Sequence, residues 1–431
     1  MNESRIHRTK TRRMFLKNVS LAGLSSLFLP RFLSSETSAL SRAVITADTA
    51  ATSGSTINAS VVHSMITSSV RSLAQVSDVG EAWKTLLPGV TTASRIGIKV
   101  NCINSSLSSH PAVANAIAST LQQMMFGGIP FPANNIIIFD RTAGELQSAG
   151  YVINTSSTGV RRYATDSAGV GYSTQTYDVA GSSQRLSKIV TDTIDFLINL
   201  AVLKNHGDAG VTLCLKNHYG TCNNPGAIHG GNCNPYIGAL NNLAPIRTKQ
   251  KVNIIDALYG IRSGGPGGPP QFAANTIIMS ADVATADYWG RKLLTDNGAT
   301  TTSYANHVDT AATTYGLGTN NPSNMEVIRL SNPSATGDEP VPIPNELHLH
   351  QNYPNPFNPS TNITFDLVRT GRVELRVLDM AGREVATLID GSMRAGQHTL
   401  VFDGSGRASG AYLCVLEAEG SRQTQRMMLV K

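Results

Sequence analysis

The stretch DFLINLAVLKNH, residues Asp195–His206, indicates how the body of this 431-residue chain is folded. It is apolar almost without interruption, so both faces of a strand formed here would be buried. Buried runs of this kind are typical of parallel sheets that carry helices on both faces. Four further runs of strand-like sequence share this character: RIGIKVNCI (95–103), NNIIIFDR (134–141), KVNIIDALYG (251–260) and NTIIMS (275–280).

Helical patterns alternate with these runs. Residues 108–128 are predicted to form a helix that starts near Ser109 or His110, has Pro111 inside its first turn and stops at Gly127. Apolar residues at helical spacing also mark 58–76 and 281–294. We therefore predict an α/β body over residues 44–330, with a mostly parallel sheet flanked by helices.

Polar side chains gather where the predicted strands end, and ligands of such sheets bind at that edge. Lys204 and His206 are two residues apart, so they project to the same side of a strand. Lys216 follows shortly after, and Asp256 ends another run. A lysine attracts an anion, and a histidine transfers protons near neutral pH. We predict that these four residues are catalytic and act on a small anionic substrate. The alternative is that the lysines cap carbonyls or pair with nearby aspartates.

A run of cysteines and histidines, CLKNHYGTCNNPGAIHGGNC (214–233), allows three interpretations, because its spacing matches no standard zinc finger. The first is a disulfide between Cys222 and Cys233, which an oxidising compartment would favour. The second is a site for a divalent transition metal with histidine ligands, His206, His218 and His229. The third is ordinary packing with free thiols.

The head of the chain is basic. Residues 1–43 hold eight of the 35 basic and two of the 29 acidic side chains, which leaves 27 of each for the rest. A nucleic-acid partner is excluded because the folded part shows no basic excess. TRRMFLK (11–17) precedes a short apolar stretch, too short and interrupted to span a membrane. The pattern resembles a twin-arginine signal peptide over 1–43, with Arg12 and Arg13 as its core. The resemblance implies export by the twin-arginine translocase.

The tail of the chain alternates in the way half-buried strands do, as in VELRV (373–377), with glycine-rich turns between about seven short strands. We predict a small all-β sandwich over 347–431, after a proline-rich linker at 331–346. The stretch resembles the C-terminal sorting domain of type IX secretion cargo, whose motif is formed here by Tyr353, Pro354, Pro356 and Phe357. The resemblance implies transfer by the type IX apparatus, through the periplasm, to the cell surface or the medium. No transmembrane segment is predicted in the mature chain.

The body also carries a resemblance. The stretch DFLINLAVLKNHGDAGVTLCLKNHYG (195–220), with IIDALYGIRSGGPGG (254–268) and IIMSADVATADYWG (277–290), is similar to domain-of-unknown-function family 362. Some members of that family add iron–sulfur modules built on Cys-x2-Cys runs. This chain has no such spacing, so no iron–sulfur motif is present and the cofactor is unknown.

Two functions are therefore open. One is an exported enzyme, with or without a metal, that acts on a small anion. The other is a non-catalytic binding or structural protein of the cell surface.

Overall fold

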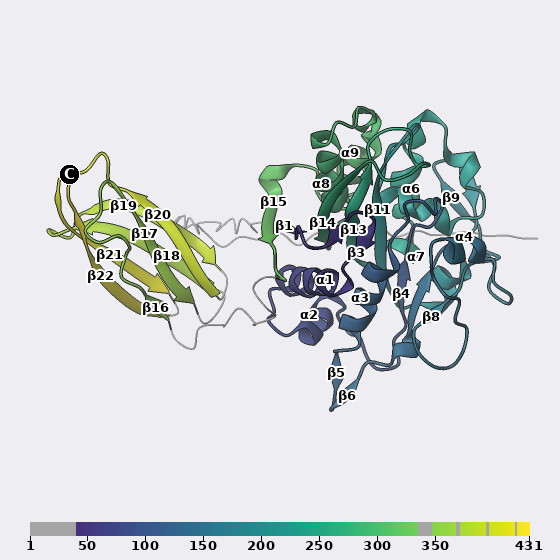
Figure 1. Cartoon of the computed structure of the whole chain (residues 1–431), viewed down its shortest axis with the longest axis horizontal. Helices are drawn as coiled ribbons and strands as arrows, with labels where there is room; N and C mark the ends of the chain where they lie inside the picture. The colour runs from purple at the N-terminus through teal and green to yellow at the C-terminus, as the bar shows by residue number, and fades with distance from the viewer. Residues whose placement is uncertain (1–39, 335–346, 368–370, 394–395, 419) are drawn as a thin grey trace, which may run out of the picture. The chain divides into compact units, whose positions relative to one another are not determined.

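The computed structural model describes residues 40–334, 347–367, 371–393, 396–418 and 420–431 (Figure 1). Arg12 and Arg13 of the predicted signal lie outside these ranges, as does most of the predicted linker, 335–346. The body and the C-terminal β domain are described separately below. No helix within the described ranges is long and apolar enough to cross a membrane.

A nine-stranded sheet forms the centre of the body, with β11 fully buried in its middle. The order along the sheet is β15 (Met325–Ser331), β1 (Ser41–Ala47), β14 (Phe272–Ser280), β13 (Gln250–Ile261), β11 (Phe196–His206), β4 (Ile96–Lys99), β7 (Ile136–Phe139) and β8 (Arg161–Arg162), and β12 (Gly210–Thr212) pairs with β11. The strands from β13 to β8 run parallel, as do β1 and β15, whereas β14 is antiparallel to both its neighbours. The predicted mostly parallel sheet is confirmed.

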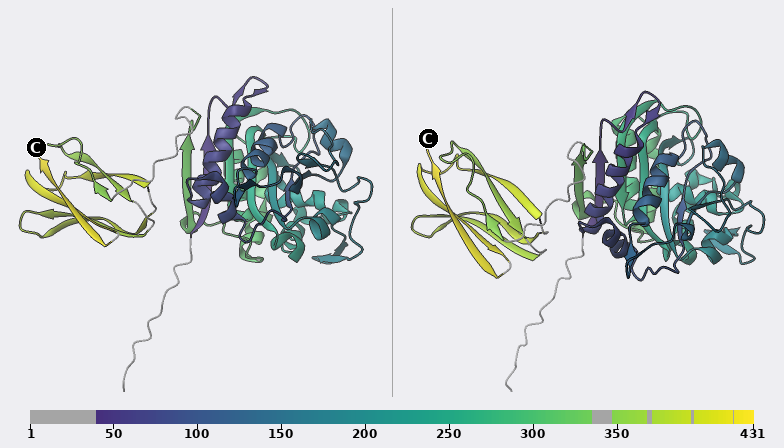
Figure 2. Two further views of the ribbon diagram at one scale, coloured as in Figure 1. Left: turned by 90° about the horizontal axis from the view of Figure 1, so that it is seen from below. Right: turned by 60° about the horizontal axis from the view of Figure 1, so that its bottom comes forward.

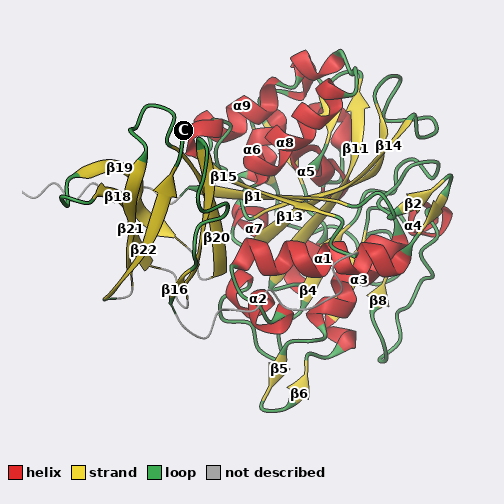
Figure 3. Cartoon of the chain, turned by 60° about the vertical axis from the view of Figure 1, so that its left-hand side comes forward, coloured by secondary structure: helices red, strands yellow, loops and turns green. Residues whose placement is uncertain are grey.

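Helices cover both faces of this sheet, as Figure 3 shows. One layer contains α1 (Ala59–Ala74), α2 (Val79–Leu86) and α3 (Pro111–Leu121), and the other contains α5 (Cys214–Asn217), α6 (Tyr236–Asn241), α8 (Val283–Asp296) and α9 (Asn306–Thr313). Each layer buries its own apolar cluster against the sheet. Shorter elements are α4 (Ala143–Ser148), α7 (Ala244–Arg247) and the hairpins β2 (Thr52–Ser53)–β3 (Thr56–Ile57), β5 (Met125–Phe126)–β6 (Ile129–Pro130) and β9 (Tyr177–Val179)–β10 (Ser182–Gln184).

Helix α3 begins as the sequence predicts but ends earlier. His110 is its N-cap and Pro111 occupies its first turn, where a missing N–H costs nothing. The helix stops at Leu121, six residues before the predicted Gly127. Gly127 and Gly128 instead form the turn of the β5–β6 hairpin, with positive φ angles of 58° and 83° that glycine adopts without strain.

The body begins before the predicted boundary at residue 44. Ser41–Ala47 form β1, which lies between β14 on one side and β15 on the other (Figure 2). Ala43 in this strand is completely buried. The predicted end of the signal peptide at residue 43 therefore lies inside a strand. At the carboxyl end of the body, β15 ends at Ser331, the residue where the linker is predicted to begin.

The C-terminal domain is a small sandwich, as predicted. A three-stranded sheet, β16 (His348–Leu349), β17 (Ser360–Leu367) and β20 (Gly396–Asp403), shares one core with a four-stranded sheet, β19 (Glu384–Met393), β18 (Gly371–Asp379), β21 (Gly410–Ala418) and β22 (Ser421–Leu429). The alternation that predicted strands is explained by β18, whose Val373, Leu375 and Val377 all point into this core. In the sorting motif, Phe357 is 1% exposed and Tyr353 is 79% exposed.

Candidate functional site

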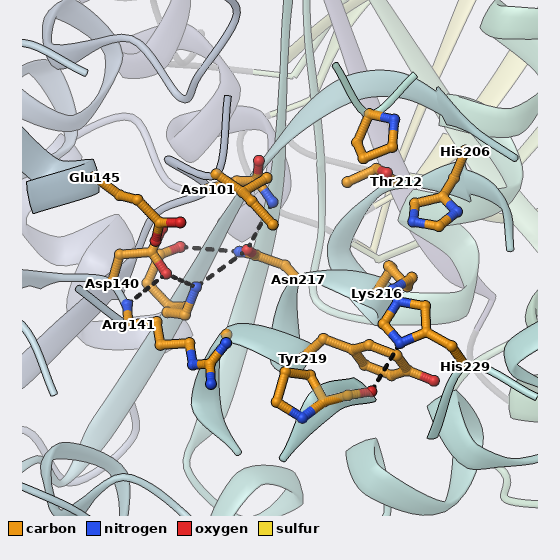
Figure 4. A pocket seen from close by; sticks show the side chains of 15 residues that line it. Asn101, Asp140, Arg141, Glu145, His206, Thr212, Lys216, Asn217, Tyr219 and His229 are labelled. Carbon is orange, nitrogen blue, oxygen red and sulfur yellow. Dashed lines mark hydrogen bonds and ion pairs between the residues drawn. The ribbon is translucent and has the colours of Figure 1, made fainter. Parts of the chain in front are cut away.

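A pocket of about 130 Å³ opens beyond the carboxyl ends of β4, β7 and β11, at the sheet edge where the sequence predicts the site. Its lining falls into two groups in Figure 4. One group contains Lys99, Asn101, Asp140, Arg141, Glu145 and Asn217. The other contains His206, Thr212, Lys216, Tyr219 and His229.

The first group is held by a buried ion pair. Lys99 Nζ donates to Asp140 Oδ1 at 2.6 Å, and also to the Val100 carbonyl and to Asn217 Oδ1. The other oxygen of Asp140 accepts the Cys102 N–H at 2.7 Å. This pair is neutral as a unit and fully hydrogen-bonded, so it serves to position its neighbours.

Gly220 is required beside this ion pair. A Cβ atom there would lie 2.7 Å from Lys99 Nζ and 2.9 Å from Asp140 Oδ1. This close approach explains why a glycine follows Tyr219 at the end of the stretch 195–220.

The second group is built around Lys216. Its Nζ lies 3.0 Å from His229 Nε2 and 3.6 Å from the centre of the Tyr219 ring. His229 Nδ1 is 2.7 Å from the Pro225 carbonyl, which can only accept, so Nδ1 carries the ring proton. His229 Nε2 therefore accepts from the lysine. Burial lowers the pKa of Lys216 to about 8.

His206 has the opposite tautomer. Its Nδ1 accepts the backbone N–H groups of Asp208 and Ala209, each at 3.1 Å, so its proton lies on Nε2. The ring stacks against His229 with centroids 5.9 Å apart. Burial, with help from the neighbouring Lys216 charge, lowers the pKa of His206 to about 4. His206 is thus neutral at physiological pH and offers an N–H donor to the pocket.

Two of the four predicted catalytic residues, His206 and Lys216, line the pocket. Lys204 is completely buried and faces Thr212 across the β11–β12 pair. Asp256 is also completely buried and does not reach the pocket. It accepts from the backbone N–H and the Nδ1 of His110, at 2.8 and 2.7 Å. Burial acts against protonation of His110, but Asp256 raises its pKa overall.

The structure does not unite the three predicted metal ligands. His218 is buried away from the pocket, where its Nε2 lies beside Gln250 Oε1 and Asn199. The group that could hold a metal is instead His206, Asp208 and His229, whose ligand atoms lie within 4.8 Å of one another. However, His206 Nδ1 is occupied by two amides and its Nε2 is protonated, so His206 presents no lone pair for a metal.

The predicted disulfide is not formed in the structure: Cys222 and Cys233 are free, buried thiols. Each thiol points to a carbonyl of its own segment, Cys222 to Tyr219 at 3.4 Å and Cys233 to His229 at 3.8 Å. Cys102, Cys214 and Cys414 are buried in the core, as their positions in apolar patterns indicate.

Sequence reasoning missed the roles of Asn101, Thr212 and Tyr219. Asn101 and Asp140 lie near the carboxyl ends of two predicted strands, so strand ends were the signal available for them. Nothing in the sequence pattern indicates that Thr212 or Tyr219 turns to the same cavity, because Thr212 ends the three-residue strand β12 and Tyr219 lies in the 3-10 helix His218–Thr221 that follows α5.

Both domain resemblances are confirmed by comparison with protein families. Residues 96–292 match the family described as domain of unknown function (DUF362), and residues 351–431 match the secretion system C-terminal sorting domain. The chain therefore joins a DUF362 domain to a sorting domain that marks it as a secreted or cell-surface protein. Every residue that lines the pocket falls within the first match.

Solved structures offer only distant likeness. A crystal structure of a protein from Thermotoga maritima matches at 9% identity, with a TM-score of 0.31, over 51% of this chain and 58% of that one. The endo-beta-1,4-mannanase from Thermotoga petrophila matches at 8% identity and a TM-score of 0.15, over 81% and 80%. No curated protein matches the sequence.

Proposed function

From a chain that joins a DUF362 domain to a secretion sorting domain, we propose an exported protein that binds a small anion in its pocket and transfers a proton to or from it. Export through the twin-arginine translocase, then through the periplasm and the type IX apparatus, is part of this proposal. The supporting features are the signal-like head and the sorting domain.

The observation that carries the proposal is the position of Lys216. Among the described residues no carboxylate lies within ion-pair distance of its Nζ, and the same holds for Arg141, which also lines the pocket. Lys99 and Asp140 neutralise each other. The pocket therefore presents two cations without ion-pair partners against one further carboxylate, Glu145, and a small anion is the ligand that would compensate the remaining positive charge.

The same residues are suited to proton transfer. Lys216 has a pKa of about 8, so its ammonium loses a proton at little cost near neutral pH. His229 Nε2 holds the lysine in place by accepting a hydrogen bond from its Nζ. His206 offers its Nε2–H to negative charge that develops on the substrate. In this proposal Lys216 is the acid–base group and His206 is the hydrogen-bond donor that stabilises negative charge on the substrate. Lys204 adds a buried positive charge that does not line the pocket.

A metal-dependent enzyme is the second candidate, favoured by the cluster of His206, Asp208 and His229. It requires His206 to turn its ring and release two backbone amides, and Lys216 to leave His229. A surface protein that binds the anion without turnover uses the same pocket, and only activity measurements separate it from an enzyme.

The test uses the full mature chain and a panel of small anions: phosphate, sulfate, acetate, glycolate, lactate and glycerol phosphate. A ligand at 100 times its Kd stabilises the folded state by about 2.7 kcal/mol, which a thermal shift detects. Lys216→Met should abolish the shift, whereas Lys251→Met, on a half-exposed lysine outside the pocket, should not. Lys216→Arg should keep binding but lose proton transfer, because guanidinium does not deprotonate.

The proposal fails if no anion gives a shift that depends on Lys216. Binding without exchange of ligand protons against deuterated water would support the binding protein. Stoichiometric metal that is lost in His229→Ala and Asp208→Asn would support the metal enzyme.

A further inference from the structure

Three buried polar atoms near the pocket have no hydrogen-bond partner among the described residues: Asn101 Oδ1, Lys204 Nζ and Thr212 Oγ1. A buried polar group without a partner is costly and rare in native proteins. Three such atoms in one neighbourhood indicate that something other than the chain is meant to bond them.

The three atoms belong to neighbouring parts of the site. Asn101 and Thr212 both line the pocket. Lys204 faces Thr212 across the β11–β12 pair, and it is close enough to Asp140 and Cys102 for both to act on its charge. One small molecule seated in the pocket can therefore reach the two lining atoms, with the Lys204 charge directly behind them.

The orientation of Asn101 is fixed by its neighbours. Asn217 Nδ2 donates to the Lys99 carbonyl at 3.2 Å, and Lys99 Nζ donates to Asn217 Oδ1. Asn217 Oδ1 is thus an acceptor, and Asn101 must present its Nδ2 to it, at 3.3 Å. The oxygen of Asn101 is left over, and an amide oxygen can only accept a hydrogen bond.

The hydrogen-bonding capacity of these three atoms specifies which groups a ligand must carry. Thr212 can donate to an oxygen of a carboxylate or phosphate, and the positive charge of Lys204, which is buried and does not line the pocket, attracts that anion. Asn101 Oδ1 requires an O–H or N–H from the same molecule. We infer that the ligand is a small anion that also carries a hydroxyl or amine donor. The inference rests on the proposed function and narrows its substrate class from any small anion to hydroxy acids, amino acids or phosphate monoesters that keep a free hydroxyl.

The test compares matched pairs that differ in one hydroxyl: glycolate with acetate, lactate with propionate, and glycerol 3-phosphate with propyl phosphate. Calorimetric titration of the full mature chain should give a Kd at least tenfold lower for the hydroxylated member of one or more pairs. A site built to bond a hydroxyl discriminates strongly against the analogue that lacks it, because its own polar atom is then left unpaired.

Two variants assign this preference to atoms. Asn101→Leu should bring the Kd values of the two members within twofold of each other. Thr212→Val has almost the same shape and should weaken both members equally, while it raises the melting temperature of the free protein. The wild-type comparison decides the matter even if Asn101→Leu does not fold.

The outcomes separate the inference from its premise. Equal Kd values within every pair overturn the inference and leave the proposed anion site intact. Absence of binding by all six compounds overturns the inference, and it also overturns the proposed anion site when phosphate and sulfate fail to bind as well. The inference is also overturned if the Kd ratio within each pair is the same in a folded Asn101→Leu variant and if Thr212→Val leaves both affinities unchanged. In that case Asn101 Oδ1 and Thr212 Oγ1 do not contact the ligand and are bonded by water.

Discussion

Replacing Lys204 by methionine should stabilise the free protein although it removes a charge from the site. Lys204 is 0% exposed, and its Nζ has no hydrogen-bond partner among the described residues. Burial lowers its pKa from 10.5 to about 8. Each pKa unit corresponds to 1.36 kcal/mol, so the folded state disfavours this ammonium by roughly 3 kcal/mol at pH 7. Methionine keeps most of the apolar stem and removes the charge. We expect Lys204→Met to gain about 2–3 kcal/mol at pH 7.

The sign of the pH dependence follows from the same shift. The folded-state pKa lies below the unfolded one, so the unfolded chain binds more protons between pH 8 and 10.5. The stability of the wild type therefore rises across this window relative to Lys204→Met. Below pH 8 the gap between the two proteins is constant, and towards pH 10.5 it closes.

Urea unfolding of the full chain, followed by tryptophan fluorescence, measures this gap. The sequence has two tryptophans, Trp83 and Trp289, and both lie in the body. Lys251→Met is the matched control on a half-exposed lysine and should change stability by less than about 0.5 kcal/mol. A Lys204→Met variant that is less stable than the wild type at pH 7, or a gap that does not close at high pH, would refute the reasoning.

Three further predictions concern the pocket, the thiols and the tail. Affinity for a bound anion should be constant below about pH 7 and fall above about pH 8, because Lys216 then loses its proton; calorimetry from pH 6 to 10 would contradict this if affinity rose with pH. Burial raises the pKa of Cys222 to about 12 and also raises that of Cys233, so both thiols of the native protein should resist iodoacetamide at pH 8. Unfolded protein should take up five labels, one for each cysteine, as measured by intact mass. Three labels would reveal a disulfide and contradict the prediction. Phe357→Ala should destabilise the sandwich by about 3–5 kcal/mol, since Phe357 packs against Phe402 at 5.9 Å in the core, whereas Tyr353→Ala should leave it unchanged; proteolysis of the tail at graded temperature compares them.

The sequence predicts elements whose burial repeats at a regular spacing. β11 is recognised because a strand buried on both faces needs a continuous apolar run, and β18 because one buried face needs alternation. β1 is missed because its partners, β14 and β15, lie more than 200 residues away in the chain. Its local signal is short, since only Val44, Ile45 and Thr46 are β-branched, and its pairing with such distant neighbours is not encoded locally.

The sequence predicts at which edge of the sheet the site lies, because polar residues gather at the strand ends there. It does not predict which of these side chains point into the pocket. Asp256 shares its face of β13 with Ile254 and Leu258, which pack on the α1–α3 layer, so it meets His110 and not the pocket. Cys214 and His218 are four residues apart and would share one face of a continuous helix, but α5 ends at Asn217 and the chain turns more tightly from His218. Side-chain direction at the end of an element depends on such local turns, which composition and periodicity do not encode.

The count of protons exchanged on binding tests the central claim most directly. At pH 8 Lys204 and Lys216 are each about half protonated, since both have a pKa of about 8. An anion stabilises both ammonium forms, so its binding should take up close to one proton, and Lys204→Met should roughly halve this uptake. Titration calorimetry in two buffers of different ionisation enthalpy gives the number. Uptake confirms that the anion binds to the lysines, whereas no exchange, or the proton release typical of metal ligation, would contradict the account.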